Sequence, residues 1–289
     1  MKRKSGLKEK KQRLIGILEA CDGLAIAFSG GVDSSFLLAV AKDVLGGKVL
    51  AVTATSAIHS RAERLAAAEI ARALGVTHRV AASREMDLPE FVANPSNRCY
   101  VCKRHVMAEV VRIAAEMGIA HVAHGVNVDD LGDFRPGLKA AEEMGLLAPL
   151  VEAGLTKADI RALSRRMGLG TWNKPSMACL ASRIPYGTAI TLENLRMVEE
   201  AEDFLRGRGF AGCRVRHHGA VARIELCQRD LKKALAAPAR KAIVGRLRAI
   251  GFRYVAVDLE GYVMGSLNRT LEGEGSRVQG GEGSSEHNL

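Results

Sequence analysis

A short run of glycines and hydroxyl side chains near the start of the chain has the residue types and spacing of a phosphate-binding loop. Ser29-Gly30-Gly31-Val32-Asp33-Ser34-Ser35 stands between an apolar strand-like segment, 24–28, and the helical pattern of 34–45. Two glycines let the backbone approach an anion, while hydroxyls and helix-start N–H groups point at phosphate oxygens. A plain glycine turn capped by Asp33 or Ser34 is the alternative, and the combination of strand, run and helix disfavours it.

The run is not a Walker A loop, because Gly-x-x-x-x-Gly-Lys-Ser/Thr occurs nowhere in the chain. Gly46-Gly47-Lys48 lacks both the earlier glycine and the following hydroxyl. The sequence therefore disfavours transfer of a γ-phosphoryl group.

Three cysteines have surroundings suited to sulfur or iron chemistry. Cys179 lies in a loop with Lys174 and Arg183 close in sequence, and nearby positive charge favours the thiolate. The thiolate is the nucleophilic form of a cysteine side chain. Cys99 and Cys102 form a Cys-x-x-Cys pair which, with one distant cysteine, could hold three irons of a [4Fe–4S] cluster.

Other interpretations of the Cys-x-x-Cys pair stay open. Cys99 and Cys102 could be a redox pair, or could join His105 and Cys179 around a structural zinc. We favour the cluster over zinc, and zinc over purely structural thiols. The remaining cysteines lie in apolar or strand contexts typical of core residues and are assigned no role: Cys21, Cys213 and Cys227.

Alternating strand-like and helical segments must position these residues. From Gly23 to about Gly170 the pattern indicates an α/β fold with a doubly wound parallel sheet. Such a sheet binds ligands at the carboxyl ends of its strands. We expect strands at 24–28, 49–55, 79–81 and 121–125, and helices at 34–45, 61–74 and 103–117.

The pattern changes beyond Trp172, because 174–187 is rich in Pro and Gly and lacks clear periodicity. This stretch predicts an active-site loop and domain junction, followed by a smaller α+β domain with helices at 192–206 and 231–250 and strands at 213–217, 222–227 and 254–259. The predicted domains are an ATP-binding domain at 1–172, an α+β substrate or oligomerisation domain at 173–265, and a disordered tail at 266–289.

Further segments of the sequence narrow the choice of protein family that the chain resembles. They are NRCYVCK at 97–103, GVNVDD at 125–130, RPG at 135–137, TWNKP at 171–175, ACLASRIPYG at 178–187, RVRH at 214–217 and ARIE at 222–225. The loop Ser-Gly-Gly-x-Asp-Ser resembles the PP-loop of ATP pyrophosphatases. Loop and segments together resemble the LarE family, the ATP-dependent sulfur insertases that help to make the nickel-pincer nucleotide cofactor, over roughly residues 10–265.

The resemblance implies an adenine nucleotide alpha hydrolase-like fold and a set of contacts to ATP. The loop would grip the phosphates, with Mg²⁺ neutralising them, and the ends of the second and fourth strands would hold the nucleoside. The implied ATP-binding residues are Ser29, Gly30, Gly31, Asp33, Ser34, Thr53, Ser56, Gly125 and Asn127, and the implied catalytic residues are Asp33, Cys179 and Arg183.

The substrate implied is pyridinium-3,5-biscarboxylic acid mononucleotide, whose carboxylates would be adenylylated, with release of pyrophosphate, and converted to thiocarboxylates. Arg183, Arg214 and Arg216 could clamp its phosphate and carboxylates, and strand alternation puts Arg214 and Arg216 on one face. Exposed arginines on a solvated strand face are the alternative. Glu202 is assigned to the substrate site, where it could bind a metal or orient the second domain.

The resemblance also bears on the sulfur source. In part of the family the cysteine that matches Cys179 gives up its own sulfur, whereas members with three such cysteines resemble reusable, cluster-dependent enzymes. We favour a [4Fe–4S] cluster held by Cys99, Cys102 and Cys179. The implied partners are sulfide or another sulfur donor, other proteins of nickel-pincer cofactor biosynthesis, and further copies of the chain in a homo-oligomer.

Composition limits the remaining classes of protein to which the chain could belong. The chain has 289 residues, 47% of them hydrophobic, and no apolar run approaches the ~20 residues of a membrane span. We expect a cytoplasmic protein that does not contact a membrane. Seven of the basic residues behind the net charge of +10 lie in 2–13, a segment expected to be a solvated helix start or a disordered terminus. Nucleic acid is not expected as a partner, because stacking aromatics are few.

Two rival functions remain. A PP-loop tRNA thiolase also uses a Cys-x-x-Cys pair with a third cysteine, but Val32 stands where such enzymes usually carry lysine. A non-catalytic ATP-binding sulfur carrier or sensor would bind ATP without turnover. ATP–pyrophosphate exchange separates this second rival from an enzyme.

Overall fold

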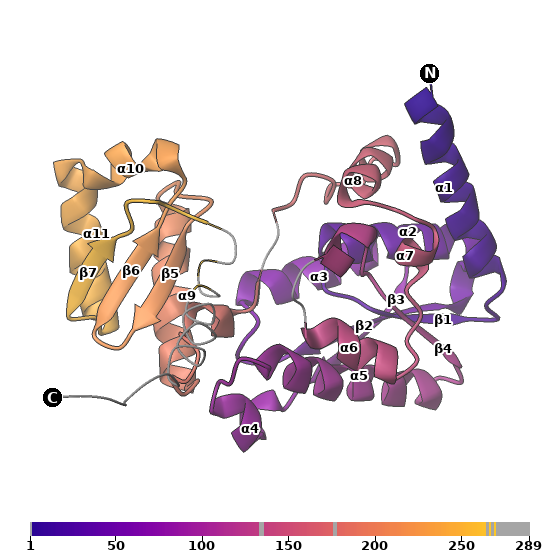
Figure 1. Ribbon diagram of the computed structural model, residues 1–289, viewed down its shortest axis with the longest axis horizontal. Helices are drawn as coiled ribbons and strands as arrows, with labels where there is room; N and C mark the ends of the chain where they lie inside the picture. The colour runs from indigo at the N-terminus through magenta and orange to yellow at the C-terminus, as the bar shows by residue number, and fades with distance from the viewer. Residues whose placement is uncertain (1, 133–135, 176–177, 264–265, 267–268, 270–289) are drawn as a thin grey trace, which may run out of the picture. The chain divides into compact units, whose positions relative to one another are not determined.

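The structure is a computed structural model that describes residues 2–132, 136–175, 178–263, 266 and 269. The chain divides into two compact units, Met1–Val92 with Asn97–Cys179, and Ala93–Ser96 with Leu180–Leu289 (Figure 1). Most of the expected tail, 266–289, lies outside the described residues, as does Arg135 of the RPG segment. None of the described helices is long and apolar enough to cross a membrane.

The first unit contains a four-stranded parallel sheet. Its strands β1 (Leu24–Ala27), β2 (Val49–Thr55), β3 (Thr77–Ala82) and β4 (His121–His124) lie in the order β3-β2-β1-β4. The predicted α/β class with a parallel sheet is confirmed. The helices are α1 (Lys2–Glu19), α2 (Val32–Leu45), α3 (Arg61–Ala73), α4 (Pro89–Val92), α5 (Arg98–Glu116), α6 (Pro136–Glu143), α7 (Pro149–Glu152) and α8 (Lys157–Arg166), with 3-10 turns η1 (Gly46–Lys48), η2 (Glu85–Asp87) and η3 (Val128–Gly132).

Alternating strand residues bury two separate cores, one on each face of the sheet. Leu24 and Ile26 of β1 pack in a core shared with α1, α2, α3, α7 and α8. Ala25, between them, packs in a second core with Met107 and Val110 of α5 and with α6. Figure 1 shows α5 and α6 on one side of the sheet and α2 and α7 on the other. The doubly wound arrangement follows, because both faces of each central strand are apolar.

The strand order places a topological switch point between β1 and β4. β2 and β3 lie on one side of β1, and the chain then crosses to the other side to form β4, which pairs with β1 from Leu24↔His121 to Ala27↔His124. The segments that follow β1 and β4 therefore lie next to each other at the carboxyl edge of the sheet, where open α/β folds bind ligands.

The basic N-terminal segment is part of a packed helix. α1 covers Lys2–Glu19, and Leu7, Leu14 and Leu18 are buried in the core that α1 shares with α2. Their spacing of seven and four residues puts them on one helical face. The charges of this segment thus belong to a helix that is anchored by its apolar face.

The second unit pairs a three-stranded sheet with helices. β5 (Arg214–His218), β6 (Val221–Glu225) and β7 (Tyr254–Val257) follow the order β5-β6-β7, with β5 antiparallel and β7 parallel to β6. Val215 and Ile224, which are register partners, pack with α9 (Leu192–Gly207) and α11 (Ala237–Ile250). The opposite face of β5 therefore carries Arg214 and Arg216 together, as alternation predicts. The unit also contains η4 (Leu180–Arg183) and α10 (Gln228–Leu235).

The single helix expected at 231–250 is wrong, because the structure has α10 and α11 instead. The break falls at Ala236, whose backbone is extended with φ −59° and ψ 138°. Pro238 lies in the first turn of α11, where its missing N–H costs nothing, whereas in a continuous helix it would interrupt the hydrogen bonding.

The first unit continues past the expected domain boundary after residue 172. Arg161 of α8 donates hydrogen bonds to the carbonyls of Trp172 (2.9 Å) and Lys174 (2.9 Å), and Lys174 donates to the carbonyl of Gly30 (2.8 Å). These bonds tie the segment after α8 to the first unit, which ends at Cys179.

A matched pair of glycine substitutions tests the close packing at the carboxyl edge. A Cβ at Gly125 would lie 2.9 Å from the backbone nitrogen of Ser34, whereas one at Gly16, an exposed position of α1, would meet nothing within 4 Å. Gly125→Ala should lower the free energy of unfolding by about 1–3 kcal/mol, because backbone must move. Gly16→Ala should raise it by about 0.5–1 kcal/mol. Guanidinium unfolding measures both, and equal stability of the two variants would contradict the packing described.

Candidate functional site

The run after β1 forms a tight turn whose shape depends on its glycines. Gly30 has φ +67°, and a Cβ there would lie 3.0 Å from the Cα of Ala67 on α3. Gly31 is the N-cap residue of α2, so the N–H groups of the next residues lie at a helix start. The hydroxyls of Ser29 and Ser34 lie 3.1 Å apart across the turn. Backbone donors and hydroxyls thus converge in one anion-binding turn.

Asp33 lies in the first turn of α2 and is paired with a lysine distant in sequence. Its Oδ2 accepts a short hydrogen bond from Nζ of Lys157, the first residue of α8. Burial raises the pKa of Asp33, and Lys157 opposes that shift. Within the described part of the chain, the buried Oδ1 of Asp33 has no hydrogen-bond partner. That oxygen could accept a cation such as Mg²⁺, which prefers carboxylate and phosphate oxygens.

The turn after β4 lies directly against the phosphate loop. Gly125 approaches the backbone of Ser34, as described above. Asn127, which is buried, donates from its backbone N (3.0 Å) and Nδ2 (2.8 Å) to Oδ2 of Asp130, and its Oδ1 accepts from the Asp129 N–H (2.9 Å). The side chain of Asn127 therefore holds the shape of the turn.

The two hydroxyls expected at the end of β2 have internal partners. Thr53 Oγ1 donates to the carbonyl of Phe28 (2.7 Å) and lies 2.8 Å from His78 Nε2. Ser56 donates to Glu85, a fully buried carboxylate that also accepts from Ser83. Thr53 thus ties β2 to the start of the phosphate loop, while Ser56 and Ser83 provide hydrogen bonds to the buried carboxyl group of Glu85.

A cavity of about 300 Å³ opens at the carboxyl ends of β1 and β2. Its described lining includes Ser29 and Thr53, three basic side chains, and apolar residues of α5. All three predicted cysteines, Cys99, Cys102 and Cys179, also line it. The structure therefore brings the expected thiols together beside the phosphate loop. The basic side chains are Arg64, Arg98 and Lys103.

The Cys-x-x-Cys pair lies within α5, which begins at Arg98 and not at the predicted residue 103. Spacing of three residues places Cys99 and Cys102 on one side of the helix. The buried residues of α5 extend back through Val101 to Arg98, the first residue of the helix. Both cysteines therefore lie within the helix, whereas the predicted start at residue 103 would have left them before it.

Burial strongly raises the pKa of the Cys102 thiol, and the nearby Cys179, Glu85 and Cys99 raise it further. Cys102 is therefore protonated near neutral pH. The described residues contain no group of three or more His, Cys, Asp or Glu side chains that could hold a metal ion as they stand. Cys99, Cys102 and Cys179 nevertheless line the same cavity.

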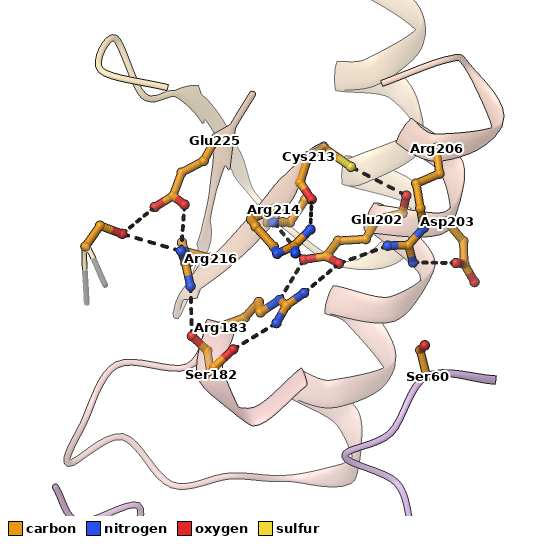
Figure 2. A network of polar contacts seen from close by, with 12 residues as sticks. Ser60, Ser182, Arg183, Glu202, Asp203, Arg206, Cys213, Arg214, Arg216 and Glu225 are labelled. Carbon is orange, nitrogen blue, oxygen red and sulfur yellow. Dashed lines mark hydrogen bonds and ion pairs between the residues drawn. The ribbon is translucent and has the colours of Figure 1, made fainter. Parts of the chain in front are cut away.

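In the second unit Glu202 organises a buried charge network (Figure 2). Arg183 donates to both of its carboxylate oxygens, from Nε (2.8 Å) and Nη2 (3.1 Å), and Arg206 and the Val215 N–H add further bonds at 3.1 Å. Burial alone would raise the pKa of Glu202, but Arg183, Arg214 and the Val215 N–H hold it below its usual value. Glu202 is thus an ionised, fully buried anchor for arginines.

Arg216 and Arg214 share a strand face but differ in their partners. Arg216 is buried and donates to Glu225 (2.7 Å) and to the carbonyl of Ser182 (2.9 Å). Arg214 donates to the carbonyl of Cys213 (2.8 Å), and its guanidinium lies 5.2 Å from the ring centroid of Tyr262. The alternative of solvated arginines is therefore wrong for Arg216, and Figure 2 shows Arg183 and Arg216 both bonded to Ser182.

Sequence reasoning missed the two lysines that contact the phosphate loop. Lys157 and Lys174 bond to Asp33 and Gly30, more than 120 residues away along the chain. Each lysine is one among many in a basic chain, and no local motif marks either as a loop contact. The spatial pairing depends on where α8 packs against α2.

Comparison with known proteins agrees with this geometry. The asparagine synthase family matches residues 19–96, which contain the phosphate loop. An uncharacterized protein of Synechocystis sp. is 40% identical over 92% of this chain and 99% of its own length. The pyridinium-3,5-bisthiocarboxylic acid mononucleotide synthase of Lactiplantibacillus plantarum is 38% identical over 92% of this chain and 96% of its own. An uncharacterized protein of Methanocaldococcus jannaschii is 27% identical over 91% of this chain.

The similarity to the synthase covers both units, and the matched family covers the strand, turn and helix that form the anion-binding turn. The chain therefore belongs to the LarE family of PP-loop ATP-using enzymes.

Proposed function

We propose that this enzyme uses ATP to insert sulfur into pyridinium-3,5-biscarboxylic acid mononucleotide. A substrate carboxylate oxygen attacks the α-phosphorus of ATP, and pyrophosphate leaves. A sulfur nucleophile then attacks the acyl carbon, and AMP leaves as the thiocarboxylate forms. The observation that carries the proposal is that the phosphate loop and the three thiols line one cavity. The similarity to the bisthiocarboxylic acid mononucleotide synthase supports the choice of substrate.

The proposed ATP site uses the loop residues Ser29, Gly30, Gly31, Asp33 and Ser34. Their N–H groups and hydroxyls would bind the phosphates, and the Asp33 oxygen without a partner would hold Mg²⁺, which neutralises phosphate charge when bound. Thr53, Ser56, Gly125 and Asn127 would act mainly by shaping the nucleoside site, because the three side chains among them bond internally.

The proposed sulfur site uses the three thiols of the cavity. Cys99, Cys102 and Cys179 would hold a [4Fe–4S] cluster, which would supply a coordination position for sulfide when bound. The cavity supports this role because Arg64, Arg98 and Lys103 outnumber Glu63, the one carboxylate of its described lining, and so offset the negative charge that thiolates bring. Arg183, Arg214 and Arg216 of the second unit would bind the anionic groups of the substrate, and Glu202 would hold Arg183 in position.

Asp33→Asn tests the ATP half-reaction. Pyrophosphate release should fall about 100-fold or more, because a metal that neutralises phosphate charge contributes several kcal/mol. Asp43→Asn, at an exposed position near the other end of α2, is the control and should keep the wild-type rate. Release of pyrophosphate by Asp33→Asn at the wild-type rate would contradict the role of Asp33 in the ATP site.

Arg214→Ala tests the substrate site. The variant should bind the carboxylated nucleotide more weakly by about 1.5–3 kcal/mol, because a charged hydrogen bond is lost, while ATP affinity stays near wild type. Arg216→Ala should act likewise, with an added loss of stability because Glu225 loses a buried partner. Arg196→Ala, which removes exposed ion pairs on α9, is the control. An equal loss of affinity for the carboxylated nucleotide and for ATP would place Arg214 outside the substrate site.

The cysteines distinguish two sulfur chemistries. With a cluster, anaerobic reconstitution with iron and sulfide should give a brown protein that turns over repeatedly, and Cys99→Ala with Cys102→Ala should remove colour and turnover. Cys227→Ala, outside the cavity, should keep both. With a sacrificial Cys179, the protein should be colourless and stop after one turnover, with a mass loss equal to hydrogen sulfide at that residue. A double variant that still turns over many times would refute the cluster.

A further inference from the structure

The phosphate loop lacks positive charge of its own. Residues 29–35 contain one ionisable side chain, Asp33, so the loop carries a charge of −1. Helix-start N–H groups amount to roughly half a positive charge. The triphosphate of ATP brings several negative charges to this place, so other parts of the fold must supply cations beyond one metal ion.

Among the described residues, two lysine ammonium groups contact this loop. Nζ of Lys157 bonds to Oδ2 of Asp33, and Nζ of Lys174 donates to the carbonyl oxygen of Gly30 at 2.8 Å. An ammonium has three N–H donors, so each lysine can keep its loop contact while it donates to a phosphate oxygen. The Lys157 side chain is 34% exposed, which leaves it accessible to a ligand.

One helix positions both ammonium groups. Lys157 is the first residue of α8, and its backbone N–H donates to Oδ2 of Asp129 (2.8 Å) at the turn beside the loop. Thr156 and Asp159 form a capping box that fixes the same helix end. One turn later, Arg161 holds the carbonyls of Trp172 and Lys174, both at 2.9 Å. The two lysines are therefore held at the loop by one rigid element.

We propose that Lys157 and Lys174 bind the β- and γ-phosphates of ATP and retain the pyrophosphate as it leaves. This inference rests on the proposed ATP chemistry and adds residues to its binding site. Two point charges on flexible stems suit a group whose oxygens move as the bond to the α-phosphorus breaks. Burial lowers the pKa of Lys174, and a phosphate beside it would favour the charged form again.

Ligands of different phosphate length test the proposal by calorimetry. Lys157→Met and Lys174→Met should each weaken the binding of ATP and of inorganic pyrophosphate about ten- to one-hundred-fold, which is the loss of affinity expected for one charged hydrogen bond. AMP, which lacks the β- and γ-phosphates, should bind within about two-fold of wild type. Lys157→Arg and Lys174→Arg keep the charge and should recover part of the ATP affinity.

Lys10→Met is the matched control. Lys10 on α1 bonds to Asp159 of α8 (2.6 Å), so its loss removes an ion pair to the same helix without touching the loop. It should leave ATP, pyrophosphate and AMP affinities unchanged. Should Lys157→Met unfold because Asp33 loses its partner, Lys174→Met, whose partner is a carbonyl, decides the question alone.

Unchanged ATP affinity in the folded methionine variants would overturn the proposal. An equal loss of affinity for ATP and for AMP would overturn it as well. A wild-type protein that discriminates ATP from AMP through these lysines but forms no thiocarboxylate would support this inference and contradict the proposed sulfur transfer. The binding assay and the sulfur assay therefore fail independently.

Discussion

The close approach of three backbone segments at the carboxyl edge of the first sheet is the constraint on which the site depends. Gly30 lies against Ala67 of α3, and Gly125 lies against Ser34 of α2, with no room for a Cβ at either glycine. Because the strands end together at the switch point, the turn after β1 has helices and a second turn around it. Its N–H groups are thus held in place before a ligand arrives, which lowers the ordering cost of binding.

Charge is arranged differently in the two units. In the second unit, the buried carboxylate of Glu202 holds Arg183 by two hydrogen bonds, and Glu225 holds Arg216. An arginine tied in this way loses little freedom on binding an anion, but it must share its donors with the carboxylate. In the first unit the cationic groups at the phosphate loop are lysines, held by one bond each.

The cavity lined by Cys99, Cys102 and Cys179 combines groups with opposing electrostatic preferences. Burial and neighbouring carboxylate and thiol groups keep the Cys102 thiol protonated, while three basic side chains of the same lining favour negative charge. A cation that binds sulfur directly would reverse the balance, since coordination deprotonates a thiol. Cys102 is therefore not a permanently ionised thiol in this cavity.

The sequence alone determined the features that arise from local patterns. Strand periodicity, the glycine run and helix starts predicted the parallel sheet, the phosphate loop at Ser29–Ser35 and the shared face of Arg214 and Arg216, because each depends on residues near one another in the chain. Only the tertiary structure decided two pairings across long stretches, Lys157 with Asp33 and Lys174 with Gly30. The grouping of Cys179 with the Cys-x-x-Cys pair was expected from the family resemblance, and the structure places all three thiols around one cavity. Those contacts depend on how α8 and α5 pack on the sheet, and packing against distant apolar faces leaves no mark on the charged or sulfur-bearing residue itself.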